Sequence, residues 1–350
     1  MTRHGEAQGQ GDAASPLALL EMISSSWMSQ AIYVAARLGI ADLLAEGPKK
    51  SDELARSVGA HADSLYRLMR GLTTLGLCAE RGDGVFELTP LGSCLRAGVD
   101  GSVRSWALHW GGSLWPIWGT LLHSVRTGQS ARALVTRRGG FDSLAQNPEA
   151  VRVFDEAMVE ISRLMAEGVV RGYDFSGIGR IVDVGSGHGE LLVAILRANP
   201  VMRGVLFDLP HVLEDARKHI EAAGVADRCE TIPGSFFESV PGGADAYLLK
   251  SVLHDWDDEH SLVILKNCHR AMAGQGKLLV VERVLPERMQ PSSEHRWMAA
   301  SDLNMMVALA GRERKEAEFR ALFGSAGFKL TRIVPAEAHY SVIEGVCSRA

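Results

Sequence analysis

A sharp turn from a strand into a helix, near the middle of the chain, most constrains how this sequence can fold. The apolar strand Arg180-Ile-Val-Asp-Val184 leads directly into Gly185-Ser-Gly-His-Gly189, and a helix is predicted from Glu190 to Ala198. Glycines permit a tight turn and let a ligand approach the backbone closely. The pattern therefore predicts a ligand-binding loop at the carboxyl end of a strand.

From this turn onward, strands alternate with helices. Seven strands are predicted, at 180–184, 204–207, 229–232, 244–249, 277–282, 328–334 and 340–346, and the last two are close enough to pair antiparallel. Helices are predicted between them at 190–198, 211–223, 261–272, 297–309 and 316–326. Such alternation predicts an α/β fold with a mostly parallel, Rossmann-like sheet that binds ligands at the carboxyl ends of its strands.

The part of the chain before residue 170 has a helical pattern instead. Helices at 51–58 and 63–75 precede two short strands that flank Arg81-Gly-Asp-Gly84, which is the outline of a winged helix. We predict a polar, disordered tail over 1–14, a winged-helix domain over 15–170 and a second domain over 171–350. Four tryptophans, Trp106, Trp110, Trp115 and Trp118, favour a core or a subunit interface over a ligand platform.

Composition excludes several classes of function. The 42 acidic residues outnumber the 37 basic ones, and the predicted recognition helix offers only Arg67 and Arg70, which argues against nucleic acid as a partner. No apolar run approaches the roughly 20 residues of a membrane span. The five cysteines are scattered, with no metal-ligand spacing. This spacing leads us to expect no bound metal. The beginning of the chain lacks a signal-peptide pattern, so we expect a cytoplasmic protein.

The residues around the glycine loop indicate what it binds. The spacing is G-x-G-x-G, and Glu190 occupies the position where a dinucleotide fingerprint has its third glycine, so a pyrophosphate would meet a carboxylate. Asp208 ends the next strand, where an acid can accept both hydroxyls of a ribose. A nucleoside without phosphates fits both observations. S-adenosylmethionine is such a nucleoside, and Asp183 would favour its positive charge.

Four further segments carry a resemblance to a known family. They are Leu249-Lys-Ser-Val-Leu-His-Asp-Trp-Asp-Asp-Glu259, Ile264-Leu-Lys-Asn-Cys268, Gly276-Lys-Leu-Leu-Val-Val-Glu282 and Gly311-Arg-Glu-Arg-Lys-Glu316. From about residue 17 to 346, the chain resembles the S-adenosylmethionine-dependent O-methyltransferases of the plant caffeic acid type and their bacterial relatives in antibiotic and pigment biosynthesis. The resemblance implies a homodimer formed by the N-terminal domain and a small aromatic or polyketide-like substrate.

The resemblance also implies catalytic residues. His254 matches the family's general base, and Glu282 and Glu313 match the two carboxylates that flank and orient it. A positioned imidazole can accept the proton of a hydroxyl as the new bond forms. Read from the local sequence alone, His254 could instead cap the following helix, and Asp255 is an alternative residue to orient the base.

Binding residues follow from the same match and from the glycine loop. We expect the cofactor at Ser162, Asp183, Gly185, Gly187, Asp208, Leu209, Ser235, Phe236, Lys250 and Ser251. We expect the substrate at Met158, Trp256, Asp302, Met305 and Met306. Ser235 stands where the family usually has an acid for the adenine amino group. The spacing from Asp302 to Glu313 is one residue shorter than in the plant enzymes, so pocket residues near Leu309 are not assigned.

The expected function is methyl transfer from S-adenosylmethionine to a hydroxyl, phenolic by preference, of a small natural product. Two alternatives stay open on this fold: methylation of nitrogen or carbon, and a hydroxylation or decarboxylation that uses the cofactor without transferring a methyl group. A more distant alternative is a regulator that binds DNA through the winged helix and senses a ligand with its second domain.

Overall fold

The computed structural model describes residues 15–136 and 147–348, so the predicted tail over 1–14 lies outside the described residues. The chain divides into two compact units, Met1–Gly111 and Gly112–Ala350. The predicted boundary near residue 170 lies later in the chain than this division. Residues from Gly112 to about 170 therefore fall in the second unit instead of the first. The reason is that the long helix α10, Pro148–Gly172, packs on α11, Glu190–Ala198, and so belongs to the second unit.

The first unit contains the predicted helices and hairpin. Its elements are α1 (Pro16–Leu38), α2 (Ile40–Ala45), β1 (Lys49–Lys50), α3 (Ser51–Val58), α4 (Ala62–Thr74), β2 (Cys78–Glu80), β3 (Val85–Leu88), α5 (Pro90–Ser93) and α6 (Arg104–His109). The strands form a small antiparallel sheet in the order β1-β3-β2. Gly39 adopts the left-handed conformation and separates α1 from α2, where the sequence pattern ran on as one apolar stretch.

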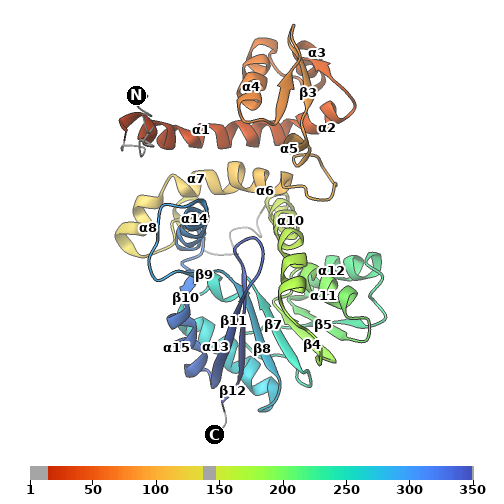
Figure 1. The fold of residues 1–350 in the computed structure, drawn as a ribbon, viewed down its shortest axis with the longest axis vertical. Coiled ribbons are helices and arrows are strands. Elements are labelled where there is room, and N and C mark those ends of the chain that lie inside the picture. The colour runs from red at the N-terminus through yellow and green to blue at the C-terminus, as the bar shows by residue number, and fades with distance from the viewer. Residues whose placement is uncertain (1–14, 137–146, 349–350) are drawn as a thin grey trace, which may run out of the picture. The chain divides into compact units, whose positions relative to one another are not determined.

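The second unit is built on a seven-stranded sheet, as predicted. Its strands are β4 (Arg180–Val184), β5 (Arg203–Asp208), β6 (Cys229–Pro233), β7 (Ala246–Lys250), β8 (Lys277–Glu282), β11 (Phe328–Pro335) and β12 (Ser341–Cys347). They lie in the order β11-β12-β8-β7-β4-β5-β6, with β12 antiparallel to both of its neighbours and the other pairs parallel (Figure 1). A separate parallel pair, β9 (Val284–Leu285) and β10 (Arg314–Lys315), was not predicted.

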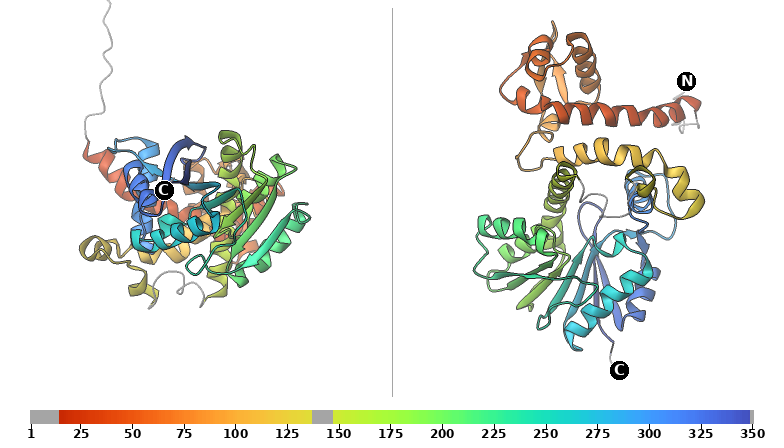
Figure 2. Two further views of the ribbon diagram at one scale, coloured as in Figure 1. Left: turned by 90° about the horizontal axis from the view of Figure 1, so that it is seen from below. Right: turned by 180° about the vertical axis from the view of Figure 1, so that it is seen from behind.

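Helices cover both faces of this sheet (Figures 1 and 2). One face packs with α10, α11 and α12 (Pro210–Ala222), and the other with α13 (Asp258–Met272) and α15 (Glu316–Ser325). Successive strand residues therefore alternate between two cores, as Ile181 and Val182 do. The remaining helices are α7 (Trp115–Trp118), α8 (Leu121–Thr127), α9 (Arg132–Thr136) and α14 (Ser293–Ala308), with η1 (Trp110–Leu114) before them.

The order of the strands decides where chemistry can occur. The chain goes from β4 outward to β5 and β6, and then returns to place β7 on the other side of β4. A crevice at the carboxyl ends of the strands forms where the direction of winding reverses in this way. The glycine loop follows β4 and the segment of His254 follows β7, so both come to this edge.

We predict that the centre of the sheet controls the stability of the second unit. Leu248 in β7 is fully buried, so Leu248→Ala should lower the free energy of unfolding by about 2–5 kcal/mol. Val201, which is 93% exposed, provides the control, and Val201→Ala should change stability by about 0.5 kcal/mol or less. Urea unfolding followed by circular dichroism measures both. Equal losses in the two variants would contradict this description of the core.

Candidate active site

The glycine loop after β4 is held in a conformation that needs its glycines. Gly185 has a φ of 71°, and a Cβ there would lie 2.9 Å from Val252 Cγ2 and 3.3 Å from Phe236 Cε1. Gly187 donates its backbone N–H to Asp208 Oδ2 at 2.8 Å. The loop is thus fixed to the end of β5 and packs closely against Val252 and Phe236.

Two carboxylates border this loop. Asp183 is 2% exposed, and its Oδ1 has no hydrogen-bond partner among the described residues. Burial raises the pKa of Asp183 to about 7. Asp208 accepts the N–H of Leu209 at 2.7 Å besides that of Gly187, and burial raises its pKa as well. Burial therefore destabilises the ionised form of both acids, and a nearby positive charge or a hydrogen-bond donor would offset this cost.

Lys250 and Ser251 extend this region from the end of β7. Lys250 Nζ donates to Ser162 Oγ on α10 at 2.8 Å. Ser251 has a φ of 54°, which is uncommon for a residue with a side chain, and its Oγ donates to Tyr340 Oη at 3.3 Å. The structure thus brings Ser162, predicted from a distant helix, to the same strand edge as Lys250.

Aromatic side chains lie beside the loop. The ring centroids of Phe236 and Phe237 are 4.8 Å apart, and that of Trp256 lies 6.3 Å from Phe236. Trp256 also stacks on His260 at 5.7 Å. Ser235 accepts the backbone N–H of Phe237 through its Oγ at 3.3 Å. Trp256, predicted for the substrate, therefore belongs to one cluster with Phe236, predicted for the cofactor.

His254 lies between two carboxylates in the 3₁₀ turn η3, Leu253–Asp255, which follows β7. Its Nδ1 is 3.1 Å from Glu313 Oε1, and its Nε2 is 3.4 Å from Asp255 Oδ1. The side chain of Glu313 is fully buried. Glu313 therefore contacts Nδ1, and Asp255 lies beside Nε2.

Glu282, at the end of β8, acts on the backbone instead of the ring. Its Oε1 accepts the N–H of Val252 at 3.2 Å and that of His254 at 3.1 Å. Of the two predicted glutamates, only Glu313 contacts the imidazole, and the second carboxylate beside the ring is Asp255. Glu282 fixes the segment that carries His254.

The charges of this cluster shift one another's pKa values. Burial opposes ionisation of His254, but Glu313, Asp255 and Glu282 raise its pKa to about 10. Burial raises the pKa of Asp255 to about 6 and that of Glu282 to about 7. Burial opposes ionisation of Glu313 too, yet His254 and Arg283 keep its pKa below the ordinary value. Without a ligand, the arrangement therefore favours an imidazolium that faces an ionised Glu313.

The expected substrate residues lie on two helices. Met158 is half-buried on α10, and Asp302, Met305 and Met306 lie on α14. Asp302 Oδ1 accepts the N–H of Glu313 at 2.9 Å, so this side chain also helps to place Glu313.

Several residues near His254 were not predicted. Ser301 donates to Glu313 Oε1 at 2.7 Å, and Arg283 Nη1 lies 3.6 Å from the same oxygen. Arg132 is 4% exposed, donates to the carbonyl of Ala308 at 2.9 Å and faces Asp255 electrostatically. The sequence does contain one signal, because an arginine directly follows each of the two glutamates that were predicted to flank His254.

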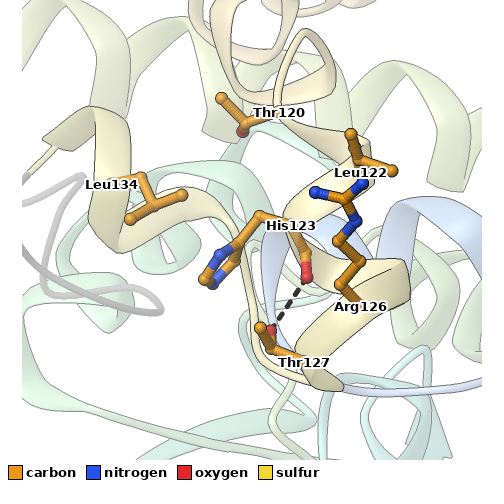
Figure 3. A pocket seen from close by; sticks show the side chains of 6 residues that line it. All are labelled: Thr120, Leu122, His123, Arg126, Thr127 and Leu134. Carbon is orange, nitrogen blue, oxygen red and sulfur yellow. Dashed lines mark hydrogen bonds between the residues drawn. The ribbon is translucent and has the colours of Figure 1, made fainter.

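A separate pocket lies on the surface of the second unit. It has a volume of about 340 Å³ and is lined by Thr120, Leu122, His123, Arg126, Thr127 and Leu134 (Figure 3). None of the predicted site residues lines it. Within the described ranges, no group of three or more His, Cys, Asp or Glu side chains could hold a metal ion. None of the described helices is both long and apolar enough to cross a membrane.

Comparison with known proteins identifies both parts of the chain. Residues 118–329 match the model of an O-methyltransferase domain, and residues 20–98 match that of an O-methyltransferase dimerisation domain. The phenazine O-methyltransferase of Lysobacter antibioticus is 45% identical over 326 residues, which cover 93% of this chain and 94% of that protein. The phenazine-1-carboxylate N-methyltransferase of Pseudomonas aeruginosa is 34% identical, over 90% of this chain and 92% of its own length.

A solved structure gives the same assignment. An O-methyltransferase from neocarzinostatin biosynthesis, in complex with S-adenosylmethionine and 2-hydroxy-5-methyl naphthoic acid, superimposes with a TM-score of 0.80 and 33% identity. The match covers 96% of this chain and 100% of that structure's chain. This chain therefore belongs to the O-methyltransferase family, with a catalytic domain of that family preceded by its dimerisation domain.

Proposed function

We propose that this enzyme transfers a methyl group from S-adenosylmethionine to a hydroxyl of a small aromatic compound, with His254 as the general base. The observation that carries the proposal is the position of His254. Its imidazole is buried at the carboxyl end of the sheet, with Nδ1 against Glu313 Oε1 and Nε2 on the opposite side of the ring. This is the arrangement of a base whose orientation is fixed by a carboxylate.

The residues around the glycine loop fit S-adenosylmethionine. The unpartnered buried oxygen of Asp183 suits a ligand with a positive charge, and Asp208 is placed to accept hydroxyls of a ribose. Gly185 lets the loop turn tightly against Val252 and Phe236, and Lys250 and Ser162 supply polar groups from β7 and α10. When bound, this cofactor supplies an activated methyl group. The chain must then align the acceptor oxygen and remove its proton.

The protonation of His254 sets the conditions for catalysis. A general base must be neutral, and a pKa of about 10 leaves little neutral imidazole at pH 7 in the ligand-free protein. A cationic ligand at the adjacent carboxylates lowers this pKa, because like charges repel. Phenols also have a pKa near 10. A base whose pKa is raised from the ordinary value toward that of the phenol is a better acceptor for the phenol's proton, which we assign to Nε2.

The nature of the acceptor atom is part of the proposal. Oxygen is favoured, because an ordered His254–Glu313 pair is useful where a proton must be removed from a hydroxyl. Transfer to nitrogen is the second candidate, since one relative is named an N-methyltransferase. Methyl-labelled cofactor and product analysis separate these two from reactions that leave the product unlabelled.

A homodimer is the proposed assembly. Helix α1 exposes Leu17, Leu20, Ile23 and Trp27, each more than half exposed and spaced along one face of the helix. An apolar stripe of this size is unusual on the surface of a monomer. Binding of DNA by the winged helix remains the less favoured use of this unit, given the net charge of −5. We also propose a cytoplasmic location, because five free cysteines suit a reducing compartment.

His254→Ala should lower the rate of methyl transfer by about 10²- to 10⁴-fold, because the base is lost. Affinity for S-adenosylmethionine should not fall, since the pairwise contacts of His254 are with carboxylates of the chain, and it should rise where the lost imidazolium repelled the cofactor's positive charge. The measurements are formation of methylated product, with the best acceptor from a panel of hydroxylated aromatic acids, and calorimetric titration of the cofactor. His123→Gln, in the surface pocket, is the control. A variant that keeps the full rate refutes the base assignment.

The pH profile offers a second test. Because the neutral imidazole is the active form, kcat/KM should rise with pH toward the raised pKa of His254. Glu313→Gln removes the carboxylate that raises the pKa of His254 most. The rising limb of the pH profile should therefore move to lower pH, while the maximal rate falls about 10²-fold or more. A limb that moves to higher pH would contradict the electrostatic role given to Glu313.

The double substitution Ile23→Glu and Trp27→Glu should convert the dimer into monomers, because it places charges in an apolar interface. Light scattering of the wild type at micromolar concentration should give twice the chain mass of 37.8 kDa, and the variant should give that mass itself. Ser25→Glu, on the opposite and exposed face of the same helix, is the control. A wild type of 37.8 kDa would refute the dimer.

A further inference from the structure

We propose that Arg283 and Arg314 are positioning residues for His254, and that each acts through a neighbour of the imidazole. The inference rests on the proposed role of His254 as a base. Each arginine directly follows one of the two glutamates, in Glu282-Arg283 and Glu313-Arg314. The parallel pair β9–β10 sets these two dipeptides side by side, with Arg314 opposite Val284.

Arg314 holds the carbonyl groups of the segment that carries His254. It is 1% exposed, and it donates to the carbonyls of Leu253 and Trp256 at 2.8 and 2.9 Å. The same guanidinium donates to Asp258 Oδ1 at 2.8 and 3.0 Å and to Ser261 Oγ at 3.2 Å, both on α13. The planar fork of an arginine can serve all these acceptors at once, and a lysine cannot.

The remaining backbone groups of the segment are also held from outside it. Glu282 accepts the N–H groups of Val252 and His254, and the N–H of Arg312 donates to the carbonyl of His254 at 2.9 Å. A Cβ at Gly311 would lie 2.1 Å from that carbonyl oxygen, so the backbone segments of Gly311 and His254 are in close contact. Arg314 is thus one side of a clamp whose other side is Glu282.

Arg283 acts on the charge of the imidazole. Its Nη1 lies 3.6 Å from Glu313 Oε1, the oxygen that also contacts His254 Nδ1. Its guanidinium stacks over the ring of Tyr340, with 4.4 Å between Cζ and the ring centroid, which keeps it in place. Arg283 and His254 therefore compete for one carboxylate oxygen, and the arginine weakens the pull of Glu313 on a proton at the imidazole.

The other charged groups around His254 come from several elements. Asp255 belongs to its own turn, Glu282 to β8, and Glu313 to the loop before β10. Tyr340 faces it from the loop before β12. Lys250 of β7 and Arg132 of α9 face Asp255. The substitutions leave all these residues in place, so a shift in the titration reports the loss of an arginine together with its effect on Glu313, Glu282 and Tyr340.

The test is the titration of His254, followed by NMR of the full-length enzyme labelled at histidine Cε1 and assigned by its loss in His254→Asn. Arg283→Met should move the midpoint up by roughly one pH unit, because a cation near the imidazole is lost. Arg314→Lys keeps the charge but loosens the segment that carries His254. The contact between His254 and Glu313 then weakens, so the midpoint should move down. The Arg314→Lys variant should also have a kcat lower by about tenfold or more, with its KM for S-adenosylmethionine nearly unchanged.

Controls keep the outcomes distinct. Arg320→Gln, in an exposed ion pair on α15, should leave the midpoint at the wild-type value. If Arg314→Lys fails to fold, Asp258→Asn weakens the same clamp from its exposed side and should shift the midpoint in the same direction by less. Wild-type midpoints in both arginine variants would overturn the inference. A fully active His254→Ala variant would instead refute the proposed function, whatever the titrations show.

Discussion

The contact between the buried side chains of His254 and Glu313 is the interaction on which the rest of the site depends. A buried carboxylate is stable only with hydrogen bonds or opposite charge around it. Glu313 finds these in His254, Ser301 and Arg283, and its own backbone is fixed by Asp302. Residues from β7, β8, α14 and the β9–β10 pair must therefore converge on one point. The sheet order permits this, because β7 and β8 are neighbours and end at the same edge.

The cofactor region follows the same physical logic. Asp183 and Asp208 are buried acids whose pKa values are raised, and each gains from a donor or a cation beside it. The glycine loop lies against both acids, and Gly185 has no side chain because Val252 and Phe236 pack closely on it. We propose that the positive charge of the cofactor, held near Asp183, lowers the pKa of His254, because like charges repel.

Much of this could be predicted from local sequence. The strand Arg180–Val184 and the helix Glu190–Ala198 match their predicted bounds, because a short apolar run and three glycines specify them. The cluster of His254 with Glu313 followed from motif matches. The roles of Arg283 and Arg314 did not, because they depend on the register of β9 against β10, which brings together residues about thirty positions apart. The extent of the second unit also escaped prediction, since the packing of α10 on α11 is a tertiary contact. The roles of the individual site residues remain proposals.

The central claim is that His254 removes the proton of the acceptor hydroxyl as the methyl group is transferred. The most direct measurement compares rates for a series of phenols of different pKa, with the wild type and with His254→Ala. A base within the enzyme makes the rate nearly independent of the acidity of the phenol. The variant must rely on ionisation in solution, so its rate should rise steeply as the phenol becomes more acidic. The same dependence in both enzymes would contradict the account.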